Sequence, residues 1–203
     1  MLFDIVAVRR YTSTLISVLL FASFASTALC QAPAYGYSSS SKGHDYKKFT
    51  HNILGFSIDI PSTWTFGING APPAAVVIIY PEGLNTGIFS AEYEAIEIGT
   101  LPAQTARSLS EAYDNVLYGM KSSHPNMTML QSPQYTTLNS HNGIQWTHQW
   151  PSKTGFSISE FITLIETQSG IRSLAVRTTQ DISLKQSYYL SILNTFEPFQ
   201  PKY

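Results

Sequence analysis

Two histidines and three glutamates carry the side chains best suited to metal binding or acid–base catalysis in this sequence. His141 and His148 are seven residues apart, and a metal ion that bound both would need a carboxylate as a further ligand. The carboxylates that could supply it, or act as a pair in acid–base chemistry, are Glu92, Glu94 and Glu160. Histidines scattered in this way are usually solvated or singly hydrogen-bonded, and carboxylates on an antiparallel sheet usually face solvent. We therefore assign no catalytic residue, metal site or cofactor.

A second group of residues is aromatic and lies on one expected strand. Trp146, His148 and Trp150 occur at every second position, so their side chains share one face of that strand. If the face points into the core, the tryptophans pack there and His148 is buried and hydrogen-bonded. If the face is open, the same residues form a platform for a sugar, lipid or peptide. Packing is the commoner role, and these three remain the candidate residues for contact with a ligand or partner.

The composition excludes several functional classes. The chain has 203 residues, of which 43% are apolar, enough for a sizeable core. With 12 Lys+Arg against 13 Asp+Glu, it lacks the basic excess that nucleic-acid binding requires. Its one cysteine, Cys30, excludes an internal disulfide and a thiolate zinc finger. The predicted mature chain contains no G-x-S-x-G, H-E-x-x-H, P-loop or G-x-G-x-x-G spacing.

The first 30 residues resemble a secretory signal peptide. Arg9 and Arg10 precede an uncharged run whose apolar centre is Leu15–Ala25. This centre is shorter than the roughly 20 residues that span a bilayer, so we expect removal of the segment and no stable span in the mature chain. Cleavage between Cys30 and Gln31 would leave a mature chain without a thiol. The second alternative is lipid attachment at Cys30. The predicted location is therefore periplasmic or secreted.

The rest of the chain is predicted to form a flexible tether and one domain. Residues 31–46 are rich in Ser, Gly and Pro and cannot bury enough apolar area to offset the entropy of ordering. Residues 47–203 form the expected domain, which we expect to be monomeric. Apolar runs and period-two alternation predict strands at 47–51, 56–60, 74–80, 90–98, 127–138, 143–150, 156–167 and 171–178.

Two helices and one tight turn complete the prediction. Apolar residues at spacings of three and four predict helices over 103–122, with Thr100 as the N-cap, and over 182–196, with Asp181 as the N-cap. Asn142-Gly143 is expected to supply the positive φ of the hairpin turn after residue 138. Segregated strands and helices of this kind are typical of an α+β fold, here with a four-strand meander between the helices.

Three short segments resemble the PsbP-like proteins. They are the strand, proline and tryptophan of 55–64, the turn of 138–143, and the final helix of 188–196 that runs into a phenylalanine and a proline. The resemblance implies an antiparallel sheet of about six strands sandwiched by helices. It also implies a non-enzymatic scaffold, since the family includes extrinsic photosystem II subunits, a nuclear Ran-binding protein and exported bacterial proteins of unknown role. No family site residue is transferred.

Three functions follow as hypotheses. The first is an exported, non-catalytic module that binds another protein or an envelope component. The second is a metal-dependent or acid–base hydrolase, which predicts that four residues converge in one cleft: Glu92, Glu94, His148 and Glu160. The third is a small-ligand carrier with a pocket lined by Trp146 and Trp150.

Overall fold

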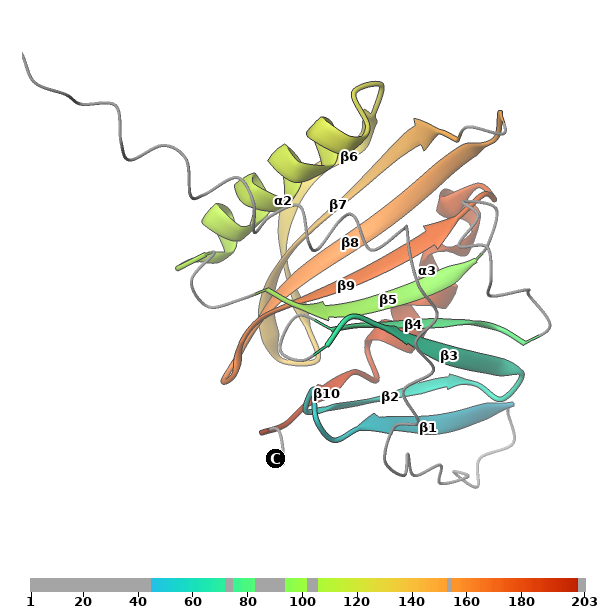
Figure 1. The fold of residues 1–203 in the computed structure, drawn as a ribbon, viewed down its shortest axis with the longest axis vertical. Helices are drawn as coiled ribbons and strands as arrows, with labels where there is room; N and C mark the ends of the chain where they lie inside the picture. Colours follow the sequence, from blue (N-terminus) through green and yellow to red (C-terminus); the bar gives the residue numbers. More distant parts are fainter. Residues whose placement is uncertain (1–44, 72–74, 83–93, 102–105, 153–154, 201–203) are drawn as a thin grey trace, which may run out of the picture.

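The computed structural model describes residues 45–71, 75–82, 94–101, 106–152 and 155–200 (Figure 1). The predicted signal peptide, its cleavage site at Cys30 and Gln31, most of the tether, and Glu92 lie outside these residues. Within the described ranges, no helix combines the length and apolar character needed to cross a membrane. These residues form antiparallel sheets and helices, so the α+β class is confirmed.

Seven of the described strands form the larger sheet: β3 (Trp64–Asn69), β4 (Val76–Pro81), β5 (Ala95–Thr100), β6 (Thr128–Leu138), β7 (His141–Pro151), β8 (Ser157–Thr167) and β9 (Gly170–Thr178). Their order is β3-β4-β5-β9-β8-β7-β6, and each pairs antiparallel with its neighbours. The strands β6 to β9 are consecutive in the chain and adjacent in the sheet, which confirms the predicted meander.

A smaller sheet of three described strands contains β1 (Tyr46–His51), β2 (Phe56–Pro61) and the short β10 (Glu197–Pro198), in the order β1-β2-β10. The prediction of one sheet with about six strands was therefore imprecise, because the described residues form two sheets with ten strands in total. One reason is local, since a turn at 62–63 directly follows β2 and leads into a strand of the other sheet. The other reason is the return of the chain end to pair with β2.

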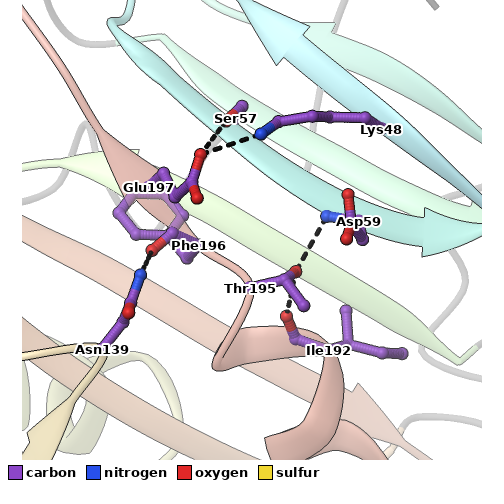
Figure 2. Close-up of polar contacts among 8 residues, drawn as sticks. All are labelled: Lys48, Ser57, Asp59, Asn139, Ile192, Thr195, Phe196 and Glu197. Atoms are coloured by element: carbon purple, nitrogen blue, oxygen red, sulfur yellow. Dashed lines mark hydrogen bonds and ion pairs between the residues drawn. The ribbon is translucent and has the colours of Figure 1, made fainter. Parts of the chain in front are cut away.

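Figure 2 shows how the segment after the last helix joins the smaller sheet. The Thr195 hydroxyl accepts a hydrogen bond of 2.8 Å from the backbone N–H of Asp59. Glu197 forms an ion pair of 2.8 Å with Lys48 of β1. The aromatic ring of Phe196, between these two contacts, is fully buried and stacks on Phe56. Polar bonds and core packing therefore both fix the C-terminal segment.

The helix α2 (Leu109–Ser123) begins later than predicted. Its N-cap is Ser108, whose hydroxyl accepts from the N–H of Glu111. The Glu111 carboxylate accepts in turn from the N–H of Arg107, at 2.8 Å. This exchange resembles a capping box and fixes the helix start. The prediction of Thr100 as the N-cap was wrong, because Thr100 ends β5 and pairs with β9.

The helix α3 (Ile182–Leu193) begins where the sequence predicts. The carboxylate of its N-cap, Asp181, accepts from the N–H of Ser183 at 2.9 Å. The apolar stripe of this helix, which includes Tyr189, is buried. Asn194 is the C-cap, so the helix ends before the predicted boundary at residue 196.

The turn between β6 and β7 differs from the prediction. Asn139 and Ser140 adopt positive φ angles of 44° and 69°, so these two residues form the tight turn. Gly143 lies within β7 and has another role. A Cβ at this position would lie 2.7 Å from the carbonyl oxygen of Leu164 on the neighbouring β8. The Asn142-Gly143 prediction was therefore wrong, because close approach of β7 to β8 and not turn geometry requires the glycine.

The helices cover opposite faces of the larger sheet. Phe161 of β8 belongs to a buried cluster with Tyr189 of α3 and with the strands of the smaller sheet. The adjacent Ile162 belongs to a second buried cluster with Met120 of α2. Because neighbouring residues in a strand point to opposite faces, α2 and α3 lie on different sides. Figure 1 shows α2 along one side of the sheet, with α3 behind it.

Candidate functional site

A row of polar side chains crosses the larger sheet on the face covered by α2. His148 of β7, Glu160 of β8 and Arg177 of β9 are directly paired in the strand register. Glu97 of β5 joins them through an ion pair of 2.9 Å with Arg177. We call these four residues the polar row. Their side chains point toward α2 because strand alternation places them on the same face as Ile162.

Glu160 is the centre of the polar row and is almost completely buried. One carboxylate oxygen, Oε1, lies 3.0 Å from Nη2 of Arg177. The other oxygen, Oε2, lies 3.1 Å from Nε2 of the fully buried His148. Both oxygens therefore have a partner within the row.

These contacts control the protonation of the row. Burial by itself would raise the pKa of Glu160, but the Arg177 charge and the His148 contact outweigh it and lower this pKa to about 2. Burial raises the pKa of Glu97 more than Arg177 lowers it. Burial would lower the pKa of Arg177, whereas the two glutamates raise it more strongly. The centre of the row is thus a carboxylate and guanidinium pair at neutral pH.

Aromatic rings surround the His148 end of the row. The indole of Trp150 stacks on His148 with 5.3 Å between ring centroids, and the guanidinium carbon of Arg177 lies 5.7 Å from the indole centroid. Trp146, also fully buried, meets Tyr113 of α2 edge-on at 5.0 Å. All three candidate contact residues are buried, which agrees with the core interpretation for the two tryptophans. Their contact with a ligand or partner stays a prediction.

The structure brings together only part of the predicted acid–base set. His148 and Glu160 meet, but Glu94 accepts hydrogen bonds from Lys185 and Tyr189 of α3, on the opposite face of the sheet. Glu92 lies outside the described residues. His141 is seven residues from His148 along β7, a separation of roughly 23 Å at the rise of a strand. Among the residues that the structure describes, no three potential ligands group around a metal position.

Two members of the row, Glu97 and Arg177, were not singled out from the sequence. Both residues fall in predicted strands, so the sequence offered them as possible members of a polar site. Their meeting depends on β5 lying next to β9, although more than 60 residues separate these strands in the chain. An uncommon charge within an apolar strand is the signal that could have identified Arg177.

Comparisons with known proteins identify the fold. No family model and no curated protein matches the chain. Among solved structures, cyanobacterial PsbP (CyanoP) from Synechocystis sp. PCC 6803 matches with a TM-score of 0.56 and 9% identity, over 81% of this chain and 98% of that one. A protein of unknown function from Pseudomonas aeruginosa, PA94, matches with a TM-score of 0.45 and 15% identity, over 79% of this chain and 100% of that one. The chain therefore has a PsbP-like fold.

Proposed function

We propose that this protein is an exported, non-catalytic module that binds another protein or a component of the cell envelope. The observation that carries the proposal is the state of Glu160, which both His148 and Arg177 contact. A carboxylate with a pKa of about 2 and with both oxygens occupied is poorly suited to transfer protons near neutral pH. Among the described residues of the predicted hydrolase set, the contact between His148 and Glu160 therefore serves structure better than acid–base catalysis.

The N-terminal sequence supports the exported part of this proposal. Arg9 and Arg10 followed by the apolar Leu15–Ala25 are typical of a signal peptide. We propose cleavage before Gln31, with acylation of Cys30 as the alternative. A tether over 31–46 would then separate the mature N-terminus from a monomeric domain over 47–203.

The PsbP-like fold adds support for a binding role. Folds host unrelated functions, so the likeness to CyanoP identifies no partner for this chain. The resemblance of the sequence to the PsbP-like proteins implies a non-enzymatic scaffold, and this implication supports the binding role. The buried Trp146 and Trp150 weigh against the carrier hypothesis, because their rings contact other side chains beneath α2.

Affinity purification from the native host tests the proposal. The full chain carries a C-terminal tag, the envelope and cytosolic fractions are purified separately, and mass spectrometry identifies the mature N-terminus and co-eluting proteins. We expect a chain beginning at Gln31 in the envelope or exported fraction, with a stoichiometric partner. A chain that keeps residues 1–30 and remains in the cytosol contradicts export. Recovery of the exported chain without any partner or envelope component contradicts the binding role. A variant that lacks residues 1–30 is the matched control for the fractionation.

A further inference from the structure

The last turn of α2 contacts the larger sheet through an aromatic stack. His124 is the C-cap of α2, and its backbone N–H donates a hydrogen bond of 2.7 Å to the carbonyl of Met120. The imidazole stacks on the indole of Trp150, with 4.4 Å between centroids and 23° between ring planes. The imidazole is only partly buried, so a proton from solvent can reach it. The end of the helix and β7 are thus joined at one ionisable ring.

Charged groups from three strands and from the helix itself surround this contact. Arg177 of β9 lies near the same indole, at 5.7 Å, and His148 of β7 stacks on it as well. Glu160 of β8 is the only one of these strand neighbours that would attract a cation, and it is already paired with Arg177 and His148. Lys121 adds a positive charge in the last turn of α2. A proton on His124 would therefore enter a region that already holds the Arg177 cation.

The balance of these effects opposes protonation in the docked state. Burial lowers the pKa of His124 most, Glu160 partly offsets it, and Arg177 and His148 lower it further. When the end of α2 leaves the sheet and is exposed to solvent, the imidazole of His124 regains its ordinary pKa of 6.5. The undocked helix end therefore binds the proton more tightly than the docked one. By linkage, docking is strongest above pH 6.5 and weakens as the pH falls below that value.

We propose that His124 and Trp150 form an acid-sensitive contact, and that protonation of His124 releases the last turn of α2 from the larger sheet. The strands stay in place because β7 is paired on both sides, by β6 and β8. The released segment is the C-terminal part of α2, which includes Met120 of the buried cluster on this face and the His124 ring that stacks on Trp150. The proposal is independent of the proposed function and adds a conformational response to it.

Amide hydrogen exchange measured by NMR on the full mature chain tests the proposal. Protection factors, corrected for the intrinsic pH dependence of exchange, are compared at about pH 7.5 and about pH 5.5. We expect protection at 120–124 to fall by about threefold or more at the lower pH, with a smaller change in α3. A loss of protection at 120–124 that is no larger than the loss across α3 and both sheets overturns the proposal, because the change would then reflect global stability and not the His124 contact.

Two variants and one control distinguish the effect of the charge on His124 from the effect of its ring stacking on Trp150. His124→Phe keeps an aromatic ring on Trp150 but cannot be protonated, so its last turn should be equally protected at both pH values. His124→Ala removes the ring and should lose protection at both. His141→Gln changes a histidine at the opposite end of β7 from Trp150 and should respond like the wild type. A His124→Phe protein as pH-sensitive as the wild type overturns the proposal. A measured pKa at or above 6.5 for the His124 imidazole in the wild-type protein also overturns the proposal. This measurement does not depend on the folding of any variant.

Discussion

The side-chain amide of Asn139 donates a hydrogen bond of 2.8 Å to the carbonyl oxygen of Phe196, across 57 positions of sequence (Figure 2). The bond joins the β6–β7 turn to the segment that leads from α3 into β10. The same asparagine adopts a positive φ of 44°, a conformation that asparagine tolerates better than most residues. One side chain therefore serves the turn and the docking of the chain end.

Replacement of Asn139 should separate these two roles. Asn139→Gly keeps the positive φ and loses the bond, and we expect a loss of about 1 kcal/mol in the free energy of unfolding. Asn139→Ala loses the bond and also strains the backbone, so its loss should be about 2 kcal/mol. Chemical denaturation measures both. Equal stability of the wild type and Asn139→Gly would show that the bond to Phe196 contributes nothing.

Glu160→Gln should destabilise the fold strongly. The substitution removes the negative charge between Arg177 and His148 while it preserves the size of the side chain. Loss of one partner from a buried ion pair costs about 3 kcal/mol, because the remaining charge has no full compensation. Glu197→Gln is the matched control, since the Glu197 pair with Lys48 is largely exposed and should contribute below about 1 kcal/mol. Equal effects in urea unfolding would contradict a structural role for the polar row.

Gly143→Ala should also destabilise the protein, although it adds a single methyl group. Its Cβ would lie 2.7 Å from the carbonyl oxygen of Leu164, so β7 and β8 would have to separate. We expect a loss of about 2 to 3 kcal/mol. Gly67→Ala on β3 is the control, because its nearest neighbour would be a Tyr80 ring atom at 3.8 Å, an ordinary contact. Thermal unfolding of both variants measures the difference, and a similar melting temperature would contradict the close approach.

His51 should make stability depend on pH. Burial lowers the pKa of His51 below 6.5, and nearby Arg172 lowers it further, although a backbone hydrogen bond partly opposes them. The unfolded chain therefore binds a proton more readily, and stability should fall as the pH decreases below 6.5. His51→Asn can still accept the hydrogen bond that the N–H of Leu54 donates to Nδ1.

The His51→Asn variant isolates this contribution. It should be less stable than the wild type near neutral pH, since the ring contact with Phe56 is lost. Its free energy of unfolding should decline less steeply between about pH 6.5 and about pH 5 than that of the wild type. Denaturant midpoints over this range measure the slope. Parallel slopes for the two proteins would exclude His51 as a source of the pH dependence.

Local sequence features predicted much of the fold. Strand alternation was sufficient for the four-strand meander, although the turn after residue 138 was assigned to the wrong residues, and Asp181 marked the start of α3. The start of α2 was missed because Thr100 is also a good N-cap type, and only strand pairing shows that it belongs to β5. The third strand of the smaller sheet depends on the long-range return of β10 to β2. Periodicity within a segment carries no information on such pairing.

For the candidate site, the sequence predicted only which residues share one face of a strand. Period two placed Trp146, His148 and Trp150 on one side of β7, and the structure confirms that side as buried. It could not show that Glu160 pairs with His148, because strand register is set by tertiary packing. Nor could it show that Glu94 reaches α3, since Lys185 and Tyr189 come from a distant helix.

We propose that Glu160 is charged at neutral pH and serves the structure, not acid–base catalysis. Carbon-13 NMR of the side-chain carboxyl of Glu160, followed over a pH titration, tests it most directly. We predict a pKa of about 2, because the Arg177 charge and the His148 contact outweigh the effect of burial. A pKa above the ordinary value of 4.5 would contradict the account, since it would describe an unpaired, buried carboxyl group that is able to exchange a proton near neutral pH.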